Sequence, residues 1–488
     1  MNVLFISAEV DPFAKVGGLA DVVGSLPKAL RSKGIDARVL MPYYGFIDQT
    51  RYNIVHLFSF QFERRNGTEY CDLYGTEHNG VPIYFLRAAP WFGQERTVYS
   101  NWDGDVPRFI FFCQAVLETA DAIRERLGWF PDLFHINDWH TGLIPFLIHE
   151  RYADERWRKV GTLLTIHNMA YQGDHVGGFT FTLGIPGRDH PILRRYDLGD
   201  NMLAIAIAYS DIITTVSPRY AVEIQYPYQS YGLHDLLRTR VPDLYGIVNG
   251  IDMDQWNPET DRLIEAHFNA DNFVEQRPPN KRQLQEESNL PVRDDVLLIG
   301  LVSRLVEQKG LDLAFPALRQ LLASNDVQFV GLGSGEPQYN ALLTSLGSDF
   351  PGKVRANVGY NAAIAQHIYA GSDLFLMPSH YEPCGTSQMF SMRYGSLPLV
   401  RETGGLADTV ENYDDGAADR GTGFVFNWET PAALLGTMQW AMRTYTERKP
   451  AWHRMQDRGM RIDFSWNKGA SEYIEHYEEA VARHRERV

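Results

Sequence analysis

The chain has 488 residues and a formal net charge of −15 at pH 7. This length exceeds what one hydrophobic core usually serves and therefore predicts two domains. The negative charge argues against nucleic acid or an acidic membrane surface as a partner, because both bind basic surfaces. Three cysteines without metal-ligand spacing, no apolar run of membrane-spanning length and no leader-like start favour a cytoplasmic protein.

Short β-branched runs alternate with helical patterns along most of the chain, which predicts an α/β architecture. Several runs are apolar throughout, as is typical of strands buried on both faces of a parallel sheet. In the first half, strands are predicted at 3–8, 37–41, 82–87, 133–137, 162–167 and 212–216. In the second half they are predicted at 296–302, 328–332, 374–377, 397–401 and 423–426. The clearest helical patterns cover 19–30, 109–127, 311–322, 362–370, 432–444 and about 466–485.

The alternation weakens between about Asp252 and Asp295, a stretch rich in proline and charge. We place the crossing between domains near 249–252, which gives domains of 1–250 and 251–463. The final segment, 464–488, carries Trp466, Tyr473 and Tyr477. These aromatic residues predict a docked helix and not a free tail.

One five-residue sequence occurs twice. Gly-Gly-Leu-Ala-Asp stands at 17–21 and again at 404–408, each time after an extended segment and before a helical one. Two glycines at a helix start leave backbone N–H groups exposed, and such donors suit a phosphate. Helix–sheet packing or coincidence would also produce such a pair. The repeats therefore mark two candidate phosphate-binding turns.

Three charged residues follow predicted strands. Lys15 lies just before the first glycine pair, where it could meet a bound phosphate. Arg304 and Lys309 follow a strand in the second half and together suit a diphosphate, because arginine binds in a bidentate manner and lysine acts as a point charge. The alternative for all three is that they are ordinary solvated cations.

A rigid loop and a His/Asp cluster complete the candidate site. Glu382, on a loop fixed by Pro383, could bind sugar hydroxyls or stabilise positive charge on a reacting carbon, or it could cap the next helix. Asp138 and His140 follow one strand and His167 ends another. Metal-ligand spacing is absent, so a sugar site fits better than a metal site. In that site Trp139 would pack on a pyranose while the polar side chains bind hydroxyls; a satisfied core histidine is the alternative for His167.

Gly331, Gly333 and Gly335 resemble part of a dinucleotide fingerprint, but the final glycine is missing. Alone they are weak evidence for NAD, and another phosphate- or nucleotide-facing turn is an equal alternative.

In family order over nearly its whole length, the chain resembles the bacterial glycogen synthases and plant starch synthases. The resemblance rests on eight motifs: Lys-Val-Gly-Gly-Leu at 15–19, Asn-Asp-Trp-His at 137–140, Thr-Ile-His-Asn at 165–168, Tyr-Gln-Gly at 171–173, Val-Asn-Gly-Ile-Asp at 248–252, Ser-Arg at 303–304 with Gln-Lys-Gly at 308–310, Glu-Pro-Cys-Gly at 382–385, and Thr-Gly-Gly-Leu at 403–406.

The resemblance implies the GT-B fold: two facing Rossmann-like domains with a cleft between them and a C-terminal helix returning to the first domain. It implies a retaining transfer of glucose from ADP-glucose to the non-reducing end of an α-1,4-glucan, with no metal and no cofactor. It places Glu382, Arg304, Lys309 and His167 in catalysis. Implied donor contacts are Lys15, Gly17, Gly18, Asn249, Tyr360, Cys384, Gly385, Thr386, Thr403, Gly404 and Gly405, and Asp138, Trp139 and His140 lie on the acceptor side, in the first domain.

The chain departs from the family pattern at three places. Thr386 stands where the family usually has leucine, and Asn137 where it usually has aspartate. The loop at 91–108 looks short and lacks the customary Asp-Asn before its Arg-Phe pair, which puts acceptor contacts in question. Two other functions stay open: a GT-B transferase that uses UDP-glucose, and a non-catalytic protein that binds glucan or nucleotide sugar. An NAD oxidoreductase is the least favoured.

Overall fold

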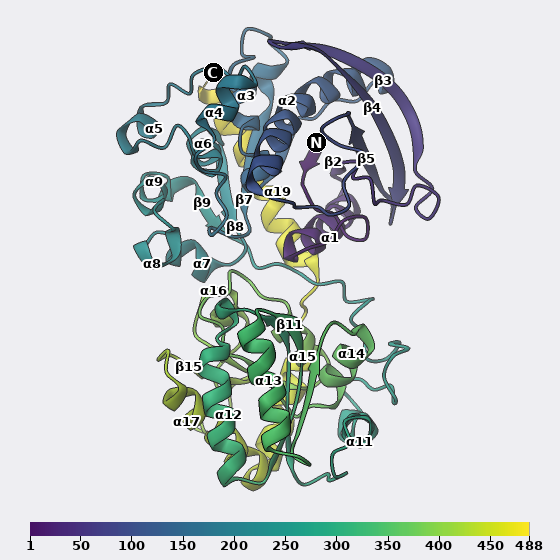
Figure 1. The fold of residues 1–488 in the computed structure, drawn as a ribbon, viewed down its shortest axis with the longest axis vertical. Coiled ribbons are helices and arrows are strands. Elements are labelled where there is room, and N and C mark those ends of the chain that lie inside the picture. The colour runs from purple at the N-terminus through teal and green to yellow at the C-terminus, as the bar shows by residue number, and fades with distance from the viewer. Residues whose placement is uncertain (488) are drawn as a thin grey trace. The chain divides into compact units, whose positions relative to one another are not determined.

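The computed structural model describes residues 1–487, and its contacts divide them into two compact units. The first comprises Met1–Gly250 together with the last helix, α19 (Trp466–Arg487). The second comprises Ile251–Ser465. Each unit is built around its own sheet with helices on both faces (Figure 1). This is the α/β architecture that the alternating sequence pattern predicts.

The first unit holds a nine-stranded sheet in the order β3-β4-β5-β2-β1-β6-β7-β8-β9. From β5 to β9 along this order, all neighbouring strands are parallel. The bounds are β1 Asn2–Ile6, β2 Asp36–Pro42, β3 Val55–Arg64, β4 Gly67–His78, β5 Val81–Arg87, β6 Leu133–Asn137, β7 Gly161–Ile166, β8 Ile212–Thr215 and β9 Leu244–Gly246. The six strands predicted for this half are all present, whereas β3, β4 and β9 were not anticipated.

The β3–β4 hairpin pairs antiparallel and extends one edge of this sheet. Its strands are largely exposed on one face, so they do not form the continuous apolar runs that mark strands covered on both faces. Phe58, Phe60 and Phe62 alternate along β3 with polar residues, and this period of two is the signal that would have revealed the strand.

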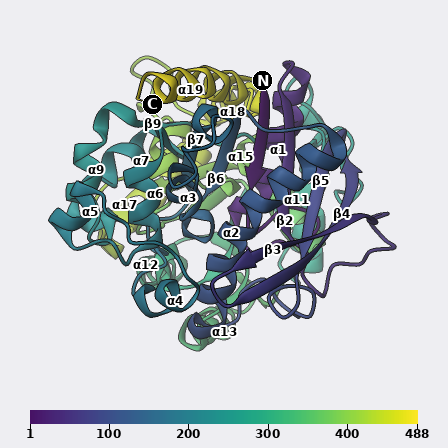
Figure 2. The same ribbon diagram turned by 90° about the horizontal axis from the view of Figure 1, so that it is seen from above.

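Helices cover both faces of the nine-stranded sheet. The apolar stripe predicted for the first helix, from Leu19 to Leu30, is buried in α1 (Gly18–Ser32). Figure 2 shows α1 and α19 on one face, with α2 (Trp102–Leu127) on the other. The remaining helices of this unit are α3 Ile144–His149, α4 Gly177–Thr182, α5 Pro191–Tyr196, α6 Met202–Tyr209, α7 Pro218–Glu223, α8 Pro227–Ser230 and α9 His234–Thr239.

Helix α2 begins seven residues before the predicted start at Phe109, because Asn101 caps it. The Asn101 side chain accepts a hydrogen bond from the N–H of Gly104 at 2.9 Å. Arg108, in the second turn, is buried and forms a 2.6 Å ion pair with Asp105 in the first turn. The segment Gly104–Phe109, where the sequence departs from the family pattern, therefore lies at the start of α2.

Helix α19 is docked as its aromatic residues predict. Tyr477 is fully buried, and its hydroxyl lies 2.7 Å from Nδ1 of His135 on β6. The indole N–H of Trp466 donates to Ser25 Oγ on α1 at 2.7 Å. These contacts make the last helix part of the first unit.

The second unit holds a six-stranded, fully parallel sheet in the order β12-β11-β10-β13-β14-β15. The strands are β10 Leu297–Leu305, β11 Val327–Gly335, β12 Val354–Val358, β13 Leu374–Met377, β14 Leu397–Arg401 and β15 Phe424–Phe426. The helices are α10 Phe273–Gln276, α11 Pro278–Glu287, α12 Leu311–Ser324, α13 Pro337–Asp349, α14 Ala362–Gly371, α15 Ser387–Arg393, α16 Gly404–Thr409, α17 Pro431–Glu447 and α18 Lys449–Arg461. All five predicted strands are present, and β12 is an addition.

The glycines at 331–335 lie inside strand β11 and do not form a turn. A Cβ at Gly333 would meet the carbonyl oxygen of Ser303 at 2.1 Å, and one at Gly335 would meet that of Leu305 at 2.3 Å. These glycines therefore let β11 approach β10 closely, and the expectation of a nucleotide-facing turn here is wrong. Among the helices of residues 1–487, none is long and apolar enough to span a membrane.

Candidate active site

The carboxyl edge of the six-stranded sheet gathers most of the predicted donor residues. Because the strands are parallel, the segments that follow β10, β13 and β14 all emerge at this edge. Arg304 lies near the end of β10, and the short helix Glu307–Lys309 follows it. Glu382 follows β13, and Thr403 precedes α16 directly after β14. Segments separated by nearly a hundred residues thus meet at one place.

A tight ion pair is at the centre of this edge. Lys309 Nζ lies 2.5 Å from Glu382 Oε2, and Ser379 Oγ donates to the same oxygen at 3.2 Å. The Glu382 residue is 7% exposed. A carboxylate so buried costs free energy unless it is paired, so Lys309 stabilises both the charge and the position of Glu382.

One backbone and one side-chain hydrogen bond fix the two loops that carry this pair. The N–H of His380 donates to the carbonyl oxygen of Gln308 at 2.9 Å, and Gln308 Nε2 donates to the carbonyl oxygen of Tyr381 at 3.2 Å. At Gly310, where φ is +67°, a Cβ would meet the carbonyl oxygen of Pro378 at 2.0 Å. Only glycine allows this close approach, which brings Lys309 to Glu382.

Arg304 lines a cavity of about 170 Å³ beside the pair. The cavity is lined by Leu301, Val302, Ser303, Arg304, Lys309, Leu376, Met377, Pro378, Ser379 and Ser387. The guanidinium of Arg304 is exposed and makes one long hydrogen bond, 3.4 Å, to Gln308 Oε1. It is therefore available to an anionic ligand, and the cavity combines two cations with apolar walls.

The second glycine pair holds the Glu382 loop. Helix α16 begins at Gly404, as the repeat predicts. The N–H of Gly405, however, donates to the carbonyl oxygens of Glu382 at 3.2 Å and Pro383 at 3.1 Å. The expectation that both glycine N–H groups are bare is therefore wrong for Gly405. A Cβ at Gly404 would meet the carbonyl oxygen of Glu382 at 2.0 Å, so packing needs glycine here.

The segment after Glu382 is ordered by Gln388. Its Nε2 donates to the carbonyl oxygens of Cys384 at 3.2 Å and Gly385 at 3.1 Å. Gly385 has φ of +71°, a conformation that favours glycine. Thr386 precedes α15 and makes no side-chain capping hydrogen bond to that helix. Glu382 likewise makes its described side-chain contacts to Lys309 and Ser379, so the alternative that it caps α15 is not what the structure shows.

Tyr360 stands apart from these residues. It follows β12, two strands away from β10, and is 89% exposed. It does not line the cavity beside Arg304. The structure thus places it at the same sheet edge without joining it to the other predicted donor residues.

In the first unit, a carboxylate that the sequence did not single out occupies the first glycine turn. Glu9 Oε2 accepts hydrogen bonds from the N–H groups of Val16 at 2.7 Å and Gly17 at 2.8 Å. Its Oε1 accepts one from the hydroxyl of Tyr99 at 2.6 Å. The N–H of Gly17 is therefore not bare, contrary to expectation. The sequence signal that could have identified Glu9 is an acidic residue between the first strand and a glycine pair.

The first glycine turn opens α1 with Gly17 as its N-cap, and Gly18 is the first helical residue. Lys15 lies directly before this turn and forms ion pairs with Asp21 and, at 3.9 Å, with Asp11. In this structure its charge is therefore shared with neighbouring carboxylates.

The strand ends of β6 and β7 bring Asn137, Asp138 and His167 together. Asp138 Oδ1 accepts a hydrogen bond from the N–H of His167 at 2.7 Å, and His167 Nε2 lies 2.9 Å from Asn137 Oδ1. Asp138 has φ of +54°, a strained conformation for a residue with a side chain. Strain of this kind persists where the surrounding contacts hold it, which makes this strand end a candidate functional site.

Burial shifts the pKa values of Asp138, His140 and His167. It raises the pKa of Asp138 to about 7, against the lowering effect of backbone N–H groups from His167 and Asn168. Burial also lowers the pKa of His167 and of His140 to about 3. Both imidazoles are consequently neutral at pH 7 and suit hydrogen bonds to hydroxyl groups more than binding of anions.

Trp139 does not offer the sugar-stacking surface that was expected. It is 6% exposed, and its ring packs against Phe109 at 5.5 Å and His140 at 4.3 Å between centroids. A Cβ at Gly173 would meet the indole at 2.5 Å, which shows how closely the backbone covers it. The structural reason is that Trp139 is the first residue of a short helix, Trp139–Thr141, whose three residues are all buried.

Asn249 is buried at the end of the first unit. Its Oδ1 has no hydrogen-bond partner among residues 1–487, and the same holds for Nδ1 of His140. Such buried polar atoms are uncommon and are compatible with a ligand contact. Within the described chain, no group of three or more His, Cys, Asp or Glu residues is arranged to hold a metal ion.

Two Rossmann-like units, with two cations and a buried carboxylate at one strand edge and neutral, buried histidines at another, define a GT-B glycosyltransferase. Comparison with known proteins agrees. Residues 2–239 match the family model of the starch synthase catalytic domain, and residues 282–455 match that of the group 1 glycosyl transferases. The chain belongs to the glycogen synthase and starch synthase family.

Relatives of full length support this assignment. The chain is 41% identical to the glycogen synthase of Desulforudis audaxviator, covering 99% of this chain and 97% of the relative. It is 42% identical to the glycogen synthase of Streptococcus gordonii, with 98% and 99% covered. The catalytic domain of starch synthase IV from Arabidopsis thaliana, solved with ADP and acarbose, superimposes with a TM-score of 0.88 at 33% identity, covering 98% of this chain and 99% of that structure.

Proposed function

We propose that this chain transfers glucose from ADP-glucose to the non-reducing end of an α-1,4-glucan, with retention of configuration at C1. The observation that carries the proposal is the Lys309–Glu382 pair beside the Arg304 cavity, in a chain of this family. A nucleotide sugar presents a diphosphate next to a hexose. The edge presents two cations next to a buried carboxylate, which matches that arrangement.

The reaction is governed by charge on the leaving group. As the bond between C1 and the phosphate oxygen breaks, negative charge grows on the diphosphate, and Arg304 and Lys309 stabilise it. We propose that Lys15 and the turn at Gly17–Gly18 add to this stabilisation. Thr403 and Gly404 would contribute mainly by holding the Glu382 loop, since the neighbouring Gly405 N–H is already used there.

Retention follows if the acceptor hydroxyl approaches C1 from the face that the phosphate leaves. The new bond joins C1 to the acceptor oxygen, the acceptor's proton passes to the departing phosphate oxygen, and ADP is released. No enzymatic base is required in this scheme. Glu382 would orient the glucose hydroxyls and not attack C1, since Lys309 and Ser379 hold its carboxylate.

The acceptor side is proposed for the strand ends of the first unit, where Asp138 and neutral His140 can exchange hydrogen bonds with sugar hydroxyls. Neutral His167, beside Asp138, is proposed to bind the hydroxyls of the transferred glucose. We assign Asn249 and Tyr360 to the donor as further contacts, the amide through its unpartnered Oδ1 and the exposed ring through stacking on the adenine.

Incorporation of radiolabelled glucose into glycogen tests the proposal. ADP-glucose and UDP-glucose are supplied in parallel, and we expect faster incorporation from ADP-glucose. Preference for UDP-glucose would assign the chain to the alternative donor, and binding without incorporation would make it a non-catalytic binder. We expect the activity to persist in EDTA, because protein cations supply the charge; loss of activity that Mg²⁺ or Mn²⁺ restores would contradict this expectation.

A further inference from the structure

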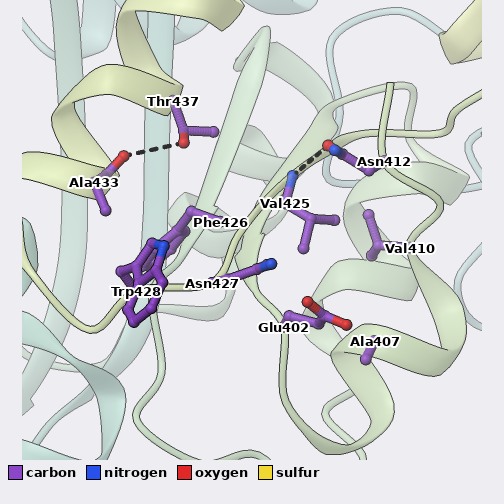
Figure 3. Close-up of a pocket in the computed structure, with 10 residues that line it drawn as sticks. All are labelled: Glu402, Ala407, Val410, Asn412, Val425, Phe426, Asn427, Trp428, Ala433 and Thr437. Carbon is purple, nitrogen blue, oxygen red and sulfur yellow. Dashed lines mark hydrogen bonds between the residues drawn. The ribbon is translucent and has the colours of Figure 1, made fainter. Parts of the chain in front are cut away.

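A second cavity, of about 470 Å³, lies at the edge strand β15 of the second unit (Figure 3). It is walled by α16, by β15 and the residues that follow it, and by α17. Its volume falls within the range of about 300–1,000 Å³ that is usual for small-molecule sites. It shares no lining residue with the cavity beside Arg304, so it is a separate feature.

One side of this cavity is formed by an exposed indole. Trp428 is 79% exposed, whereas most tryptophans are largely buried in folded proteins. Figure 3 shows its ring next to Phe426, across the cavity from Ala407 on α16 and from Val410, which follows that helix. An indole in this position presents a flat apolar face and one N–H donor to whatever enters.

Polar groups converge on the same space. The side chains of Glu402 and Asn427 project between the indole and α16 (Figure 3), and neither has a hydrogen-bond or ion-pair partner within residues 1–487. Asn412 uses its Oδ1 to accept the N–H of Val425 at 2.8 Å, which leaves its Nδ2 group as a donor. The cavity thus offers the carboxylate of Glu402 as an acceptor, the amide of Asn427, and the Nδ2 donor of Asn412.

The charge of the lining limits the class of ligand. Of the ten described residues that line the cavity, Glu402 is the one charged residue, and it is negative. An anion such as a phosphate or nucleotide would be repelled. A neutral polyhydroxyl ligand fits, because each hydroxyl both donates and accepts and the C–H face of a pyranose packs on an aromatic ring.

We propose that this cavity binds a segment of the α-1,4-glucan and holds the polymer on the second unit, away from the reacting end. The choice of ligand rests on the proposed function. Sequence neighbours of two lining residues connect the cavity to the donor edge. Glu429, next to Trp428, pairs with Arg401 at 3.0 Å, and Arg401, next to Glu402, donates through Nε to the carbonyl oxygen of Ser379 at 2.8 Å. A glucan held here is therefore held by the same unit that carries Glu382.

Binding to glycogen without any donor tests the site directly. In affinity electrophoresis through gels that contain glycogen, Trp428→Ala should bind at least about tenfold more weakly than the parent, as buried aromatic contacts commonly contribute. Trp428→Phe should retain most of the binding, because a flat ring remains. Kinetically, Trp428→Ala should raise the KM for glycogen and leave both kcat and the KM for maltotriose unchanged, because a trisaccharide is too short to occupy two sites.

Phe181→Ala, which removes an exposed aromatic ring from the first unit, is the matched control and should bind glycogen like the parent. Unchanged retardation of Trp428→Ala would overturn the proposal. It would also be overturned if light scattering showed that the substitution abolishes self-association while glycogen binding persists, since the cavity would then be an interface between copies. The two proposals fail separately: a chain that transfers no glucose can still lose glycogen binding on Trp428→Ala, and an active chain can be unaffected by it.

Discussion

Lys309 Nζ lies 2.5 Å from Glu382 Oε2 although 73 residues separate the two in the chain. The contact exists because β10 and β13 are adjacent and parallel, so the loops that follow them leave the sheet side by side. The pair joins the residue proposed to stabilise the leaving diphosphate to the residue proposed to orient the hexose. Removing either one should therefore disturb the other.

Lys309→Ala should lower kcat by roughly 10²-fold or more, because it removes a cation from the leaving group and leaves Glu382 buried and unpaired. Steady-state kinetics with ADP-glucose and glycogen measure this. Lys468→Ala, which removes an exposed lysine of α19, is the control and should turn over normally. Near-normal turnover of both Lys309→Ala and Arg304→Ala would contradict the proposed diphosphate contacts.

A double-mutant cycle separates the two functions of Lys309. If Lys309 acts only by steadying Glu382, the combined variant Lys309→Ala/Glu382→Gln should be no slower than Glu382→Gln alone. We expect a further loss in the combined variant, because the cation also acts on the phosphate. Equal rates for the double variant and for Glu382→Gln would restrict Lys309 to a positioning function.

Gly404→Ala should lower both activity and stability. The residue has φ of +43°, and a Cβ would meet the carbonyl oxygen of Glu382 at 2.0 Å, so the loop that carries Glu382 must move. We expect a loss of about 1–3 kcal/mol in the free energy of unfolding and a fall in kcat. Gly436→Ala in α17 is the control: its Cβ would meet nothing within 4 Å, and alanine favours a helix, so stability should be unchanged or slightly higher. Equal behaviour of the two variants would contradict the packing argument.

The strand-to-loop pattern of the sequence predicts the part of the site that lies after strands. Arg304, Lys309 and Glu382 could be predicted to meet because parallel strands share a carboxyl edge. What the sequence could not supply are contacts made across loops. Nothing local to the repeat indicates that Gly405 uses its N–H to hold Glu382. The acidic residue between the first strand and the glycine pair marks Glu9 as a nearby carboxylate, but does not indicate that it accepts the N–H of Gly17.

The direction of the Trp139 ring and the β3–β4 hairpin are two further features that the sequence analysis did not predict. The sequence identifies Trp139 as an aromatic residue after a strand, but the direction of its ring depends on the short helix that it begins and on packing against Phe109. The hairpin was not predicted because a half-exposed strand lacks the continuous apolar run that reveals β1 or β7. The direction of a side chain is decided by tertiary packing, which residue order alone does not specify, whereas the alternation of Phe58, Phe60 and Phe62 was a usable signal for the edge strand.

The buried histidines predict acid sensitivity. In the unfolded chain His140 and His167 titrate near their ordinary value of 6.5, whereas in the fold the pKa of each is about 3. Below about pH 6.5 the unfolded chain therefore binds more protons, and stability that is fully present above this value is lost as the pH falls toward 3. Each histidine should contribute a slope of about 1.4 kcal/mol per pH unit. Urea unfolding of His167→Gln at several pH values should show a shallower acid loss than the parent, and His175→Asn, at an exposed site, should show no change.

Asp138 should act in the opposite direction in the same range. Its pKa is raised from 3.8 to about 7 in the fold, so between these values the folded chain holds a proton that the unfolded chain has released. Stability from this group therefore increases as the pH falls from 7 to about 4 and offsets one histidine. Asp138→Asn should remove the offset and steepen the acid loss by about 1.4 kcal/mol per pH unit. A parallel pH dependence of variant and parent would contradict the assignment.

Tyr477→Phe tests whether α19 is an integral part of the first unit. The Tyr477 hydroxyl lies 2.7 Å from His135 Nδ1, whose other ring nitrogen lies 2.7 Å from Thr165 Oγ1, and all three side chains are buried. Removing the hydroxyl leaves a buried imidazole nitrogen without its partner, so the free energy of unfolding should fall by about 1–3 kcal/mol. Urea unfolding measures the change, and Tyr70→Phe, at an exposed ring on β4, should leave stability within about 0.5 kcal/mol of the parent. If the two variants proved equally stable, the hydrogen bond between α19 and β6 would contribute nothing to the fold, and the helix would be held by its apolar contacts alone.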